Sequence, residues 1–143
     1  MPYPPELVEP MRRELTQLGV QELRSAEDAR RALEETQGSA LLVVNSVCGC
    51  AAGNARPGVA MALRNQNLPD KLFTVFAGQD LEATATAREY LPGYPPSSPS
   101  IALLQDGELV LMLERKDIEG RTALDVARVL REGFDRYCAP QPS

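Results

Sequence analysis

The residues of this chain best suited to covalent chemistry are Cys48 and Cys50, which are separated by one glycine. A thiolate is both a nucleophile and a soft metal ligand, so this spacing indicates either thiol chemistry or a metal site. Cysteines two positions apart can form a disulfide only in a constrained turn, and Gly49 would give the backbone that freedom. A tight ring is easier to reduce than a relaxed bridge, which favours a redox pair over a structural disulfide.

The elements expected around the motif place Cys48 at the start of a helix. Residues 40–45 are a continuous apolar run, typical of a central strand covered on both faces. Residues 51–66 have a helical pattern, and Pro57 leaves open an interruption near residues 54–58. Unpaired N–H groups and the helix dipole at such a junction favour the thiolate. We therefore expect Cys48 to be the nucleophile and Cys50 its resolving partner.

The rest of the chain predicts alternating helices and strands. Ser25, Asp80 and Thr122 are expected helix caps, and the Asp106-Gly107 pair predicts a hairpin between residues 101–105 and 108–114. Further elements are expected at residues 5–18 (helix), 20–23 (extended), 26–38 (helix), 72–77 (strand), 81–90 (helix) and from 123 onward (helix).

This order indicates an α/β fold of the thioredoxin-like plan. A parallel βαβ portion is followed by a crossover helix, a C-terminal β-hairpin and a final helix, so the central sheet is mixed and flanked by helices. We expect a single domain over residues 1–143, with an N-terminal helical extension at residues 5–18 and a short frayed C-terminal tail from Ala139.

A proline-rich loop supplies the second part of the candidate site. Ser98 and Pro99 stand just before the strand at residues 101–105, where a thioredoxin plan has a cis proline beside the cysteine loop. An extended substrate could hydrogen-bond to the backbone there while Cys48 attacks its disulfide. An ordinary proline-rich turn is the alternative for this segment taken alone.

Composition excludes several classes of partner. The 143 residues carry a net charge of −5, which argues against nucleic acid or an anionic membrane surface. No apolar run approaches the about 20 residues of a membrane span. The first six residues lack the pattern of a secretory signal, and three cysteines do not make a disulfide framework. We expect a cytoplasmic protein.

Residues 45–58, NSVCGCAAGNARPG, resemble the signature of the bacilliredoxins, bacterial thioredoxin-like proteins with a Cys-Gly-Cys site. Residues 94–100, 106–109 and 118–121 resemble the same family in the same order, so the likeness covers essentially the whole chain. The resemblance implies removal of bacillithiol from mixed disulfides on protein cysteines, and some members are regarded as disulfide isomerases. The implied partners are bacillithiolated client proteins and bacillithiol as co-substrate, with no tightly bound cofactor.

On that resemblance Cys48 takes over the bacillithiol cap, and Cys50 or a second bacillithiol then resolves it. One departure is that residues 114–118, where the family includes histidine, have none, and neither does the rest of the chain. Arg56, Asn54 and the backbone at the helix start remain as candidates for steadying the thiolate, although Arg56 could equally be a plain solvated arginine. We assign substrate binding or site shaping to Gly49, Asn54, Arg56, Ser98 and Pro99.

Three alternatives stay open. The cysteines could be buried small residues, or they could hold zinc or copper, which would need Cys138, a carboxylate or a second subunit to complete the ligands. The chain could also be a noncatalytic domain that binds extended peptide in the groove beside Pro99. We expect Cys138 to be an inert or tail thiol, no metal at the site, and a monomer or weak dimer.

Overall fold

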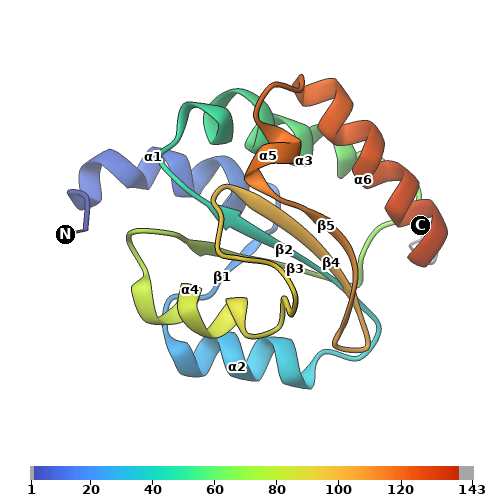
Figure 1. Ribbon diagram of the computed structural model, residues 1–143, viewed down its shortest axis with the longest axis horizontal. Coiled ribbons are helices and arrows are strands. Elements are labelled where there is room, and N and C mark those ends of the chain that lie inside the picture. Colours follow the sequence, from blue (N-terminus) through green and yellow to red (C-terminus); the bar gives the residue numbers. More distant parts are fainter. Residues whose placement is uncertain (1, 139–143) are drawn as a thin grey trace.

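The computed structural model describes residues 2–138 and centres on a five-stranded mixed sheet in the order β1-β3-β2-β4-β5 (Figure 1). β3 pairs in parallel with both β1 and β2, whereas β4 is antiparallel to β2 and to β5. The mixed sheet and the C-terminal hairpin confirm the predicted fold class. The strands are β1 (Gln21–Glu22), β2 (Ser39–Asn45), β3 (Lys71–Phe76), β4 (Ser100–Gln105) and β5 (Glu108–Leu113).

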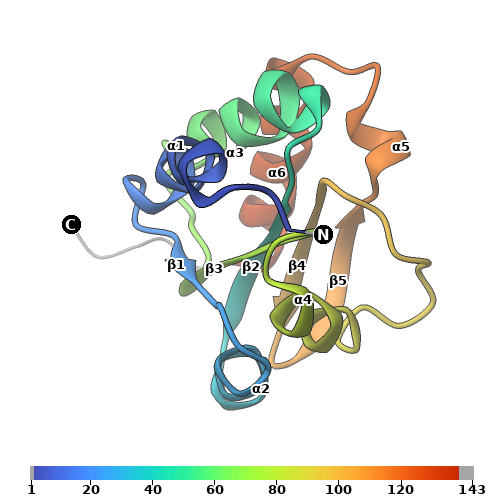
Figure 2. The same ribbon diagram turned by 90° about the vertical axis from the view of Figure 1, so that its left-hand side faces the viewer.

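Helices cover both faces of this sheet. In Figure 2, α1, α3 and α6 lie on one side of the strands and α2 and α4 on the other. The helices are α1 (Pro5–Thr16), α2 (Ala26–Glu35), α3 (Arg56–Ala62), α4 (Leu81–Arg88), α5 (Arg115–Ile118) and α6 (Ala123–Tyr137), with a π-helical turn, η1 (Ala51–Ala55), before α3.

The central strand β2 is buried along its whole length, as its apolar run predicts. Leu41 and Val43 face the cluster beneath α1, α3 and α6, whereas Leu42 and Val44 face the cluster beneath α2 and α4. Alternating side chains therefore contribute to two cores, one on each side of the sheet. This double packing fixes where β2 ends and where the following loop begins.

Short polar signals set several boundaries as the sequence predicts. The Ser25 side chain accepts the Asp28 N–H at 3.0 Å, and Thr122 and Asp125 form a reciprocal capping box at α6. Asp106 and Gly107 both have positive φ, 50° and 83°, which suits the tight turn between β4 and β5.

Two local predictions need correction. Asp80 occupies the predicted N-cap position of α4, but its side chain makes no cap hydrogen bond; its carboxylate instead accepts two hydrogen bonds from Arg12 of α1, at 2.7 and 3.0 Å. The predicted strand through residue 114 ends at Leu113, and a short helix, α5, follows it. Reciprocal bonds between Glu114 and Asp117 cap that helix, which is too short to show an apolar period.

The open question at Pro57 is resolved by a change of helix type. η1 is a π-helical turn whose Arg56 N–H donates to Ala51, and α3 continues directly from it with Pro57 in its first turn. The wider π-helical turn accommodates Pro57 without ending the helix.

Gly58 allows close contact between α3 and α6, because a Cβ there would lie 2.7 Å from a Val126 methyl carbon.

The N-terminal helix buries Val8 and Leu15, and Leu15 belongs to the core cluster that α3 and α6 form with the sheet. Within residues 2–138 there is no helix whose length and hydropathy would suit a membrane span. The predicted frayed tail from Ala139 lies outside the described residues.

Candidate functional site

The Cys48-Gly49-Cys50 motif follows the C-terminal end of β2 and opens the helical segment that contains η1 and α3. The Cys48 carbonyl accepts the N–H groups of Ala51 at 2.9 Å and Ala52 at 3.3 Å. Cys48 therefore stands at the first turn of this segment, where free N–H groups and the helix dipole favour negative charge. This is the position that the sequence predicts.

The two sulfur atoms are adjacent. Cys48 Sγ and Cys50 Sγ lie 2.6 Å apart, and both residues are half-buried. The Cys50 backbone N–H also points to Cys48 Sγ, at 3.4 Å. Two sulfur atoms in direct contact suit a pair that alternates between dithiol and disulfide.

The environment separates the roles of the two thiols. The hydrogen bond from the Cys50 thiol is the largest influence on Cys48 and lowers its pKa; burial opposes it, and the Cys50 N–H and the Arg115 charge assist. Burial and the neighbouring Cys48 sulfur raise the pKa of Cys50. Cys48 is thus the thiol that ionises first as pH rises, while Cys50 holds its proton to higher pH and stabilises the Cys48 thiolate.

Arg115 is a site residue that the sequence analysis missed. It begins α5 and is held by Glu119, whose carboxylate lies 3.2 Å from Nη2, and by the Ser97 hydroxyl, which accepts its backbone N–H at 3.3 Å. The sequence analysis singled out residues 114–118 only because they lack the histidine of the family. Nothing else in the sequence indicated that this short helix, distant from Cys48 along the chain, would bring a positive charge close to the thiolate.

Arg56 shapes the loop and does not steady the thiolate directly, which corrects one expectation. Its buried guanidinium donates from Nη1 to Asn45 Oδ1 at 2.8 Å and to the Ser46 carbonyl at 2.9 Å. Its Nε lies 3.1 Å from a carboxylate oxygen of Glu14 in α1. Ser46 Oγ in turn accepts the Cys48 N–H at 3.2 Å, so Arg56 acts on the cysteine through the end of β2.

Asn54 also supports the site through another element and not by bonding to either sulfur. Its side-chain amide donates to the Ile118 carbonyl at 3.0 Å and so joins η1 to α5, the helix that carries Arg115.

Gly49 has no positive φ, and a Cβ there would meet nothing within 4 Å. The backbone freedom expected of Gly49 is therefore not used in this conformation.

The Ser98–Pro99 peptide bond is cis, as expected from the loop before β4. Pro99 is buried, whereas Ser98 lines a cleft with Cys48. This cleft of about 490 Å³ is lined by Tyr3, Ser46, Val47, Cys48, Ala77, Gly78, Arg88, Ser98 and Arg115. The sequence therefore identified two parts of one cleft, and the fold adds Tyr3, Arg88 and Arg115.

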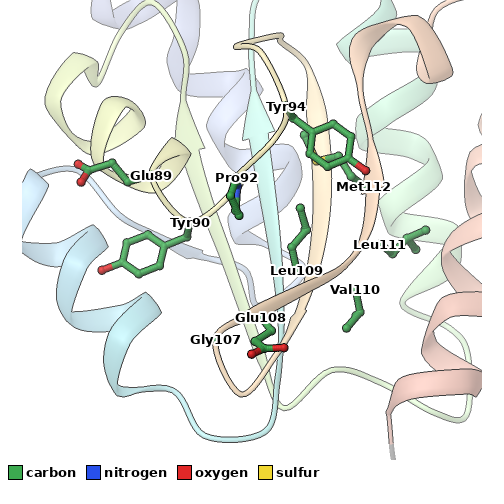
Figure 3. A pocket seen from close by; sticks show the side chains of 10 residues that line it. All are labelled: Glu89, Tyr90, Pro92, Tyr94, Gly107, Glu108, Leu109, Val110, Leu111 and Met112. Carbon is green, nitrogen blue, oxygen red and sulfur yellow. The ribbon is translucent and has the colours of Figure 1, made fainter.

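A larger cavity, about 760 Å³, does not involve either cysteine. It runs between the end of α4, the loop that follows it and β5 (Figure 3). In Figure 3, Tyr90 lies on one side of it, whereas Tyr94 lies toward Met112 on the other side, where the β5 residues Leu109 to Met112 line the cavity. Because no cysteine lines this cavity, the cleft beside Cys48 is the candidate active site.

The third cysteine is remote from this site. Cys138 is buried at the end of α6 beside Ser39, at the start of β2, whereas Cys48 follows the other end of that strand. Burial raises the pKa of the Cys138 thiol. No group of three or more His, Cys, Asp or Glu residues within the described chain is arranged to hold a metal ion, so the metal alternative would need ligands from elsewhere.

The family comparison and the sequence relatives agree with this geometry. The family described as Disulphide isomerase matches residues 3–138. A bacilliredoxin of Salinibacter ruber is 57% identical over 143 residues, covering 99% of this chain and 84% of that protein. A bacilliredoxin of Koribacter versatilis is 52% identical over 136 residues, covering 95% of this chain and 94% of the relative.

Solved structures support the fold. The chain superposes on Fasciola hepatica thioredoxin with a TM-score of 0.55 at 19% identity, covering 82% of this chain and 99% of the other. Mitochondrial thioredoxin 3 of Saccharomyces cerevisiae gives a TM-score of 0.54 at 16% identity, covering 82% and 95%. With the family match and its paired cysteines, the chain belongs to the bacilliredoxin family of thiol–disulfide oxidoreductases and has a thioredoxin-like fold.

Proposed function

We propose that this protein removes bacillithiol from mixed disulfides on protein cysteines. The observation that carries the proposal is the paired state of the two sulfurs, 2.6 Å apart, with a lowered pKa at Cys48 and a raised pKa at Cys50. A nucleophilic thiolate with a protonated resolving thiol beside it suits a reaction in two exchange steps. The name of the relatives, bacilliredoxin, supports bacillithiol as the cap.

In the first step the Cys48 thiolate attacks the bacillithiol sulfur of the client's mixed disulfide. A new S–S bond forms between Cys48 and bacillithiol, the old S–S bond breaks, and its electron pair leaves on the client sulfur, which takes a proton from solvent. Access to Cys48 from the cleft allows this attack. The client thiol is restored, and the protein now carries the cap.

In the second step Cys50 loses its proton and attacks the Cys48 sulfur. Bacillithiol leaves as a thiol, and the product is a Cys48–Cys50 disulfide, so the protein dithiol supplies both electrons. Alternatively, a second bacillithiol thiolate attacks the sulfur of the bound bacillithiol, so that bacillithiol disulfide forms and Cys48 leaves as the thiolate, which restores the starting protein. After the intramolecular route, two further thiols, from bacillithiol or a dithiol reductase, reduce the Cys48–Cys50 disulfide.

The family description also supports disulfide isomerisation. In that reaction Cys48 would attack a client disulfide, and a second client thiol would displace it with no net change of oxidation state. Because a client thiol replaces the resolving step, isomerisation needs Cys48 and not Cys50. Bacillithiol removal remains the proposed main reaction because it uses both thiols, Cys48 with its lowered pKa as nucleophile and Cys50 as the resolving thiol.

The test is release of a client protein's thiol from its bacillithiol mixed disulfide, followed under single-turnover conditions. We expect wild type to release the thiol and Cys48→Ser to lose at least about 100-fold in rate, since the nucleophile is absent. Cys138→Ser is the matched control and should retain the wild-type rate, because Cys138 is buried away from the cleft. Equal rates for wild type and Cys48→Ser would overturn the proposal.

A further inference from the structure

Besides the nucleophile Cys48, the active-site cleft is lined by two positively charged side chains and by no carboxylate. Its nine lining residues include Arg88 and Arg115 and no aspartate or glutamate. This contrasts with the whole chain, whose net charge is −5. A local cationic wall on an acidic protein attracts anionic groups to that wall and repels them elsewhere.

Arg88 is poorly compensated where it stands. One of its guanidinium nitrogens donates to the Ser97 carbonyl at 3.2 Å, and no ion pair joins it to a carboxylate in the part of the chain that the structure covers. Burial alone lowers the pKa of Arg88, with no acidic neighbour to oppose it. A guanidinium that is partly desolvated and unpaired gains most from an incoming carboxylate.

The loop before Pro99 brings the two arginines together. Ser97 accepts from the Arg88 side chain through its carbonyl and from the Arg115 backbone N–H through its hydroxyl. Glu119, the residue that follows α5, contacts Arg115 and remains exposed, so it partly neutralises that guanidinium without entering the cleft lining. Arg88 and Arg115 are therefore placed by the same loop, on the cleft that contains the nucleophile.

From this arrangement we infer that the cleft binds a carboxylate on the thiol cap of the mixed disulfide, with Arg88 and Arg115 as its partners while Cys48 attacks the cap sulfur. The inference rests on the proposed function and names the cap chemistry that the site selects. A cleft of about 490 Å³ suits a small molecule, which favours the cap over the client as the source of the carboxylate. The reaction itself is the first exchange step described above.

The test compares caps that differ in charge on one client peptide. A single cysteine is capped with mercaptosuccinate, which carries two carboxylates, or with neutral mercaptoethanol, and single-turnover release is measured for each. We expect wild type to release the mercaptosuccinate cap about tenfold faster at equal concentration below saturation. Each of Arg88→Gln and Arg115→Gln should reduce this ratio by about threefold or more, and added salt should reduce it further. Using the ratio cancels any general effect of a substitution on Cys48.

Arg31→Gln is the matched control, since it removes the same charge from an exposed position on α2 and should leave the ratio unchanged. A second peptide pair, with glutamate or glutamine beside the capped cysteine, distinguishes a client carboxylate from one on the cap. The inference is overturned if wild type releases both caps at equal rates, if the arginine variants keep the wild-type ratio, or if only the client glutamate alters the rates. Absence of release from any capped peptide, a bacillithiol-capped one included, would instead contradict the proposed function.

Discussion

At the residue scale, the chemistry of this protein depends on an asymmetry between two thiols. The contact with the Cys50 thiol lowers the pKa of Cys48, while burial and the Cys48 sulfur raise the pKa of Cys50. The sequence alone predicted both roles, because a cysteine at a strand-to-helix junction has a known electrostatic setting. It could not predict Arg115, whose position depends on a short helix that folds back toward the motif.

This asymmetry predicts the pH dependence of alkylation. Because the pKa of Cys48 is lowered, its reaction with iodoacetamide should reach half its maximal rate at a pH below that of an ordinary thiol, and Cys50 should react more slowly. Arg115→Gln should move the Cys48 midpoint to higher pH, since it removes a positive charge that favours the thiolate. Peptide mapping after timed alkylation gives both rates.

The control for the alkylation series is Arg128→Gln, which removes an exposed positive charge from α6 that is paired with Asp125. It should leave the Cys48 midpoint unchanged. A midpoint for wild-type Cys48 above that of a free cysteine would refute the assigned roles. If Arg128→Gln shifted the midpoint as much as Arg115→Gln does, a local effect of Arg115 would be excluded.

At the element scale, the site is held by the junctions of β2, η1 and α5. Most element types followed from the sequence, because the apolar run of β2 and the Asp106-Gly107 turn are strong local signals. The π-helical turn and α5 did not, since each spans five residues or fewer and is fixed by tertiary contacts. Asn54, which bonds to the Ile118 carbonyl, is one such contact.

The junction between β2 and α3 depends on Arg56, so its loss should be costly. Arg56→Met leaves Asn45 Oδ1 and the buried Ser46 carbonyl without a charged donor, and we expect a loss of about 2 to 3 kcal/mol in the free energy of unfolding. Urea denaturation measures this change. Arg64→Met, at an exposed position just beyond α3, is the control and should change stability by less than about 0.5 kcal/mol. A loss for Arg56→Met as small as that of the control would show that Arg56 does not support the loop.

At the scale of the whole molecule, an ion pair joins the two helical layers. Arg12 of α1 pairs with Asp80, which precedes α4 in the opposite layer, and both side chains are buried, with 4% and 8% exposure. The Arg12 guanidinium also lies over the Phe76 ring, 5.1 Å from its centroid. The sequence could not reveal this contact, since it joins residues 68 positions apart and replaces the expected helix cap.

Removing one partner of this ion pair should lower the free energy of unfolding more than removing both partners. Arg12→Met leaves the buried Asp80 carboxylate with only the exposed Arg24, whose Nε lies 3.8 Å away, as a charged partner, and we expect a loss of about 3 kcal/mol. Adding Asp80→Leu should recover part of that loss, because the double variant contains no unpaired buried charge. A double-mutant cycle by urea denaturation measures the coupling, and strict additivity of the two substitutions would argue against a coupled pair.

The most direct test of the central claim is to find where the cap is transferred. Cys50→Ser protein is mixed with a bacillithiolated client and quenched by acid, and intact mass with peptide mapping then identifies the modified cysteine. We expect one bacillithiol on Cys48, trapped because the resolving thiol is absent, and an equal amount of freed client thiol. If the client remains capped, or if the adduct lies on Cys138 and not on Cys48, the proposed reaction and the role of Cys48 are both contradicted.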